Sequence, residues 1–112
     1  RNLSLDRWRA LRARKRGGGQ TELALSELEE CLPAAGRPER EVEAQALAES
    51  LNRFLSALPR EKRMLFVQRY WYLRPVEELA AAHGMRKNTA ASALFRLREQ
   101  LRQHLEKEGF TV

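Results

Sequence analysis

Cysteine is almost absent from this chain of 112 residues, which contains Cys31 alone. A single thiol excludes a disulfide framework and a cysteine-based zinc site. No apolar run approaches the roughly 20 residues that span a bilayer, and no secretory signal is present. We therefore expect a protein of the reducing cytoplasm that does not enter membranes. Since Arg1, and not a methionine, opens the chain within a helical pattern, we also expect a fragment of a longer protein.

Residue groups typical of catalysis, cofactor binding or metal binding are missing as well. His83 and His104 stand far apart and do not form a metal-ligand motif. Glu77 and Glu78 are neighbours, but adjacent residues of a helix point about 100° apart, so they are not a catalytic pair. No Ser-His-Asp set, Walker loop or dinucleotide motif occurs. We expect no enzyme, no cofactor and no metal site.

Signals for β-strands are also lacking, because no alternating run of β-branched residues and no Asn-Gly hairpin turn occurs. Helical periodicity is present instead. Residues 2–16 place Leu5, Trp8 and Leu11 on one stripe surrounded by arginines, and the glycines at 17–19 end this helix. Residues 20–45 have the composition of a tether, in which 21–32 could form a short acidic helix. The fold class is all-α.

Charge is arranged in blocks along the chain. Residues 1–16 carry a net charge of +6, residues 17–50 carry −6, and residues 51–112 carry +6. Two basic blocks separated by an acidic one indicate two surfaces that face a polyanion such as nucleic acid. The alternative is an ordinary solvated surface.

The C-terminal half shows the clearest pattern. Apolar residues at helical spacing predict helices before Leu58-Pro59, over 60–72, and from Pro75 to His83, with Gly84 as a left-handed cap. A long helix follows, with an apolar stripe at Ala90, Leu94, Leu97, Leu101 and Leu105. A short helix, a glycine turn and a longer arginine-rich helix predict a helix-turn-helix, whose second helix enters the major groove of DNA.

Two stretches resemble the sigma-70 family of bacterial RNA polymerase sigma factors, in particular the small extracytoplasmic-function type. Residues 1–16 resemble the end of the second conserved region of the family. The fourth region is resembled by Leu58-Pro59-Arg60-Glu61-Lys62-Arg63, Arg69-Tyr70, Glu77-Glu78-Leu79-Ala80, Gly84, Thr89 and Phe95-Arg96-Leu97-Arg98.

The resemblance implies three segments with separate tasks. Residues 1–16 would be the last helix of a truncated domain that reads the −10 promoter element, with Asn2, Asp6 and Arg9 as candidate DNA contacts. Residues 17–45 would be a flexible acidic linker. Residues 46–112 would form the helix-turn-helix domain that reads −35 promoter DNA and docks on core RNA polymerase. An anti-sigma factor is a further implied partner.

Candidate DNA contacts lie at the start of the last predicted helix: Arg86, Lys87, Asn88, Thr89, Ser92, Phe95 and Arg96. Arg86 stands where family members commonly have a small hydroxyl residue, which puts an N-cap contact in doubt. Ala91 and Ala93 replace residues that are usually basic, so −35 discrimination is also in doubt. Phe95 follows Leu94 by about 100° and should point away from the core, where it could touch a thymine methyl; packing on the preceding helix is the alternative.

Two other functions remain open. The domain could bind only proteins, either polymerase or an anti-sigma factor, or the chain could be an ordinary helix-turn-helix regulator that dimerises on a palindrome. A dimer could also arise in a fragment if the stripe of residues 5–11 packs on a second copy. We expect Trp8, Tyr70 and Trp71 in the core and Cys31 as an exposed, inert thiol.

Overall fold

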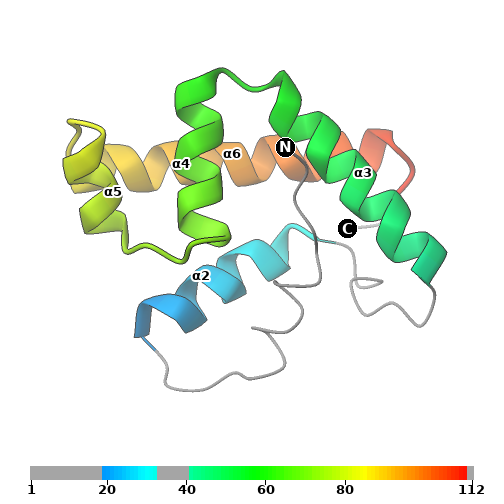
Figure 1. The fold of residues 1–112 in the computed structure, drawn as a ribbon, viewed down its shortest axis with the longest axis horizontal. Helices are drawn as coiled ribbons and strands as arrows, with labels where there is room; N and C mark the ends of the chain where they lie inside the picture. The colour runs from blue at the N-terminus through cyan, green and yellow to red at the C-terminus, as the bar shows by residue number, and fades with distance from the viewer. Residues whose placement is uncertain (1–18, 33–40, 111–112) are drawn as a thin grey trace.

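The computed structural model describes residues 19–32 and 41–110, with side chains for 23–32 and 45–110. The predicted helix over 2–16, with Asn2, Asp6, Trp8 and Arg9, lies outside the described residues. The described part contains helices and no strands, which confirms the all-α prediction. In chain order the helices are α2 (Gly19–Glu30), α3 (Glu41–Ala57), α4 (Arg60–Tyr70), α5 (Val76–Ala82) and α6 (Lys87–Lys107) (Figure 1).

Helix α6 is the longest of these elements, and its apolar stripe faces the core. The five stripe residues predicted from the sequence are all buried: Ala90, Leu94, Leu97, Leu101 and Leu105. Helix α5 packs on the first half of α6, α4 crosses its middle, and α3 lies along its C-terminal part (Figure 1). Since every partner helix covers the same stripe, the opposite face of α6 is left to solvent.

Prolines and a glycine set the ends of the middle helices. Pro59 is the N-cap residue of α4 and Pro75 is that of α5, so α5 begins at Val76, one residue later than predicted. Gly84 has φ +66°, as predicted for a left-handed cap. The Met85 N–H donates to the Ala80 carbonyl at 2.9 Å, and the Gly84 N–H donates to the Ala81 carbonyl at 3.3 Å. This pair of hydrogen bonds is a Schellman motif, which ends α5 and fixes the turn into α6.

The core includes aromatic residues from α3 and α4. Phe66 lies at its centre, with ring centroids 4.8 Å from Tyr70 and 6.2 Å from Phe54. Trp71 is 4% exposed, which confirms the prediction that Tyr70 and Trp71 are core residues. Edge-on and tilted ring pairs of this kind add to the apolar burial.

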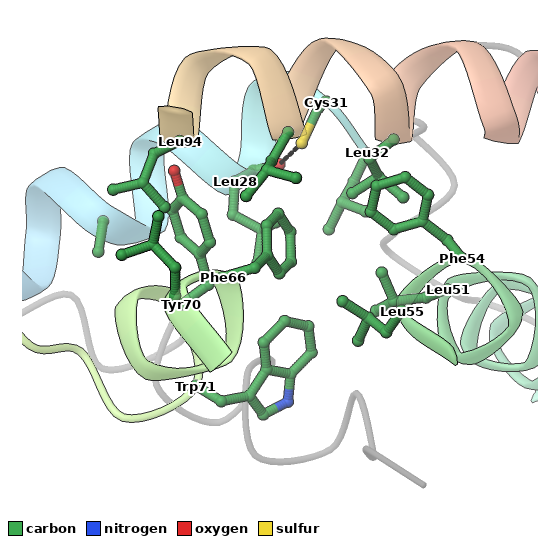
Figure 2. Close-up of a cluster of buried hydrophobic side chains, with 14 of the residues drawn as sticks. Leu28, Cys31, Leu32, Leu51, Phe54, Leu55, Phe66, Tyr70, Trp71 and Leu94 are labelled. Carbon is green, nitrogen blue, oxygen red and sulfur yellow. Dashed lines mark hydrogen bonds between the residues drawn. The ribbon is translucent and has the colours of Figure 1, made fainter. Parts of the chain in front are cut away.

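Helix α2 differs from the tether that was expected for the acidic segment. The sequence allowed a short helix over 21–32 within a tether, and a helix is present there. However, it packs against α4, and Ala24, Leu25, Leu28, Cys31 and Leu32 are buried in the same core as the other helices. Figure 2 shows Leu28 and Leu32 directed toward Phe54 and Phe66. The expectation of an unpacked tether is therefore wrong for residues 24–32.

Cys31 corrects a second expectation. Its side chain is 3% exposed and not on the surface, and its Sγ donates to the Leu28 carbonyl at 3.1 Å. Burial raises the pKa of the thiol to about 12, which keeps it protonated near neutral pH. The thiol is inert because it is buried.

Candidate nucleic-acid interface

The N-terminal half of α6 presents one solvent-exposed face. All seven candidate DNA contacts are exposed, and so is Ala91: Arg86, Lys87, Asn88, Thr89, Ala91, Ser92, Phe95 and Arg96. Ala90, Leu94 and Leu97 lie on the opposite, buried face. The structure thus places the candidates together on a single surface of about three helical turns, which is the size of element that enters a major groove.

Arg86 occupies the N-cap position of α6 with extended backbone angles, φ −77° and ψ 153°. Its side chain makes no capping hydrogen bond, as expected for a residue without a short acceptor. The first turn of α6 contains no acidic residue. The positive end of the helix dipole is therefore added to the charges of Arg86 and Lys87 at one location, which favours a bound anion.

Phe95 is the largest apolar residue on this face. Its side chain is 56% exposed, which confirms that it points away from the core. The guanidinium carbon of Arg98 lies 5.7 Å from the centroid of the Phe95 ring. A cation over the ring face stabilises this position of the ring. Phe95 is thus held in place at the surface without being covered.

Glu77 and Glu78, two adjacent residues of α5, form ion pairs with different partners. Glu77 Oε2 lies 3.4 Å from Lys87 Nζ, and Glu78 Oε1 lies 3.8 Å from Arg74 Nη1. All four side chains are more than half exposed. A hydrogen bond from its own backbone N–H, together with the Lys87 ammonium, lowers the pKa of Glu77 below its usual value. A carboxylate, that of Glu77, therefore lies beside Lys87 in the candidate interface.

A largely buried polar cluster, which the sequence pattern did not predict, joins α2, α4 and α6. Tyr70 Oη donates to Glu27 Oε1 at 3.0 Å, and Arg98 Nη1 donates to Tyr70 Oη at 2.6 Å. Arg69 Nε lies 3.5 Å from the same Glu27 oxygen, and Arg69 Nη1 donates to the Arg74 carbonyl at 3.0 Å. Burial and the neighbouring Glu27 raise the pKa of Tyr70, so the phenol keeps its proton.

Contacts within this cluster distinguish two arginines of α6, Arg98 and Arg96. The Arg98 side chain is 17% exposed and is held by Tyr70 and Glu27, whereas Arg96 is exposed. Arg69 is fully buried with a carboxylate as its counter-ion, as a buried charge requires. Arg98 therefore belongs to the interior of the domain. The available signal was the helical spacing of Leu25, Leu28 and Leu32, which marks the segment that contains Glu27 as amphipathic.

A second polar cluster connects α3 with the end of α6. His104 Nε2 donates to the Ser50 carbonyl at 2.9 Å, and the Ser50 hydroxyl donates to Glu108 Oε1 at 2.6 Å. Glu108 also pairs with Arg53, and the Arg53 and Ser50 hydrogen bonds lower the pKa of the Glu108 carboxyl. His83 contacts Gln68 Oε1 at 3.3 Å. His83 and His104 thus make separate hydrogen bonds. No metal-binding group of three His, Cys, Asp or Glu residues occurs among the described residues.

Within residues 19–32 and 41–110, none of the helices has the length and apolar character needed to cross a membrane.

Residues 48–101 match the family model described as sigma-70, region 4. The matched range begins within α3 and ends within α6, so it includes the whole exposed face, whereas α2 lies outside it. Region 4 is a helix-turn-helix domain that binds −35 promoter DNA in sigma factors, and it is not an enzyme family. Neither the curated proteins nor the solved structures gave a match.

Proposed function

We propose, on the premise that residues 48–101 form a sigma-70 region 4 domain, that this chain reads −35 promoter DNA with the first half of α6 and docks on core RNA polymerase. One observation carries the proposal. The exposed candidate residues are gathered on the face of α6 opposite the buried stripe, in the second helix of the helix-turn-helix. In such a unit the N-terminal residues of the second helix meet base edges.

The exposed side chains divide by chemistry into two groups. Arg86, Lys87 and Arg96 carry the positive charges that bind phosphates and set the orientation on the duplex. Asn88, Thr89 and Ser92 supply donors and acceptors for base edges, and Phe95 supplies an apolar contact for a thymine methyl. This division predicts that most of the affinity is electrostatic, whereas discrimination between sequences rests on a few uncharged groups.

The finer assignment comes from the resemblance of residues 1–16. In this proposal the chain belongs to an extracytoplasmic-function sigma factor, and Asn2, Asp6 and Arg9 contact the −10 element. The chain is expected to bind duplex DNA in the compartment that holds core polymerase, the cytoplasm. An anti-sigma factor and a dimer through the stripe of residues 5–11 remain predictions.

A protein-interaction module is the second candidate, and a specific observation favours it. Ala91 is exposed in the middle of the candidate face and has no donor or acceptor in its side chain, and Ala93 is half-buried against the core. Met64 and Tyr72 are exposed apolar residues elsewhere in the domain. On this alternative the domain binds polymerase or an anti-sigma factor and contributes little to DNA binding.

Removal of single charges distinguishes the two functions. Lys87→Ala and Arg96→Ala should each weaken binding to all duplexes about equally, because each phosphate contact releases counterions. Arg96→Ala should reduce the salt slope by about 0.9, and Lys87→Ala by less, because Lys87 is already paired with Glu77. Lys107→Ala removes the same charge from the exposed far end of the same helix and serves as the matched control.

The measurement is fluorescence anisotropy of labelled random-sequence duplexes at several salt concentrations. If Lys87→Ala and Arg96→Ala bind as the unchanged chain does, and only as weakly affected as Lys107→Ala, these residues are not in the interface. The protein-interaction function would then be preferred.

A further inference from the structure

Glu77 and Glu78 are adjacent in sequence and equally placed with respect to the solvent, but they have different partners. Their side chains are 56% and 60% exposed. Glu77 reaches across the turn to Lys87, in the first turn of α6, while Glu78 pairs with Arg74, which lies before α5. Only one of the two carboxylates is therefore connected to the recognition helix.

The turn between α5 and α6 sets the position of Glu77 relative to Lys87. It lies in the first turn of α5, and the Schellman motif at Gly84 sets how α5 leads into α6. The hydrogen bond from its own backbone N–H and the Lys87 charge both favour the ionised carboxylate. The acidic group thus faces Lys87 in the free domain as a charged partner.

A DNA phosphate and the Glu77 carboxylate compete for the Lys87 ammonium group. The first helix of a helix-turn-helix crosses the DNA backbone, so the start of α5 approaches phosphates when α6 enters the groove. A carboxylate there either gives up Lys87 to a phosphate or keeps it and leaves the phosphate uncompensated. Both outcomes reduce the electrostatic gain on binding, which is the sequence-independent part of the affinity.

The geometry points to Glu77 as a positioning residue that acts through Lys87: its carboxylate competes with DNA phosphates for the Lys87 ammonium and so weakens sequence-independent binding. This inference rests on the proposed DNA-binding function and deepens it. Base contacts by uncharged residues of α6 then account for a larger share of the affinity for a correct site.

The test compares Glu77→Gln with Glu78→Gln in the full chain. Both substitutions remove one negative charge from the first turn of α5, so they alter the net charge and the helix-dipole interaction alike. Only Glu77→Gln releases Lys87. Binding to labelled random-sequence duplexes is followed by anisotropy from about 50 to 200 mM salt, and thermal melts report folding.

Glu77→Gln should tighten binding roughly threefold at the lowest salt and steepen the log–log salt slope by part of the ~0.9 that one fully neutralised phosphate contributes, namely the part that pairing with Glu77 withholds from Lys87. Glu78→Gln should change the slope by much less. In a Lys87→Ala background Glu77→Gln should have no further effect, because a double-mutant cycle isolates the pair.

Two failures are distinguishable. If Lys87→Ala weakens binding but Glu77→Gln and Glu78→Gln act alike, the carboxylate works only through net charge, and the inference is wrong while the proposed function stands. If Lys87→Ala leaves the affinity and slope unchanged both in the unchanged chain and in the Glu77→Gln background, Lys87 does not contact phosphate, and the assignment of this face to DNA fails together with the inference.

Discussion

Ala91 is the residue of the exposed α6 face that offers least to DNA. It lies one turn before Phe95 and beside Ser92, and its methyl group has neither charge nor donor. Because an arginine bound to guanine contributes about 1–3 kcal/mol of discrimination, an alanine here leaves the isolated domain with modest selectivity. Binding of both promoter-reading domains through polymerase would restore selectivity by raising the effective concentration of the second contact.

Ala91→Arg tests whether this position faces DNA. Arginine is almost as favourable in a helix as alanine, and the site is exposed, so the thermal melt should stay close to that of the unchanged chain. Duplex binding should become tighter through a phosphate or a guanine edge. The measurement is anisotropy at one salt concentration against the same set of duplexes.

Gln103→Arg is the matched control, since it adds the same charge at an exposed position in the far half of α6. A folded Ala91→Arg variant that binds no more tightly than Gln103→Arg would remove Ala91 from the interface. That result would favour the protein-interaction function over DNA binding.

At the scale of elements, α2 is the helix whose role is least expected from its composition. It lies outside the matched region 4 range, and yet its leucines fill the space beside α4, and its Glu27 neutralises Arg69 and Arg98. A helix of this length is marginal by itself, so its stability comes from this packing. In the proposed sigma factor, part of the linker is therefore joined to the −35-reading domain.

Leu28→Ala should show how strongly α2 is attached. Leu28 is fully buried among aromatic side chains (Figure 2), so the substitution should cost about 2–5 kcal/mol of unfolding free energy through lost burial and a residual cavity. Leu23→Ala, on the same helix but 49% exposed, should stay within about 0.5 kcal/mol. Urea denaturation of the two variants gives the comparison.

Cys31 supplies a second readout of the same contact. It is the only cysteine, it follows Leu28 by about one turn, and its buried thiol should react slowly with a maleimide. Leu28→Ala should speed the reaction, whereas Leu23→Ala should not. Equal stability and equal labelling rates for the two variants would mean that α2 does not pack on the domain.

At the scale of the whole molecule, local pattern predicted most of the elements but not all of their packing. The stripe from Ala90 to Leu105 repeats at helical spacing, and prolines and Gly84 mark the helix ends, so these features are visible in a short window of sequence. The exposure of the candidate site followed from the same periodicity, because a helix with one buried stripe presents its other face to solvent.

The rest depended on contacts between residues far apart in the chain. Glu27 pairs with Arg98 across most of the chain, and four glutamates between residues 22 and 30 give this segment the composition of a solvated tether. Leu25, Leu28 and Leu32 were a signal that it is amphipathic. Periodicity alone, however, does not say which surface such a helix covers, and so the burial of Cys31 was missed.

The central claim is that, within residues 41–110, the first half of α6 is the part that binds duplex DNA. The most direct measurement is a titration of duplex DNA into the nitrogen-15-labelled chain, followed by amide chemical shifts. Within residues 41–110, the perturbed amides should be concentrated from Arg86 to Arg96, with little change from Leu101 to Lys107. Perturbations that cluster on α3 or α4 and spare the start of α6, or no perturbation at duplex excess, would contradict it.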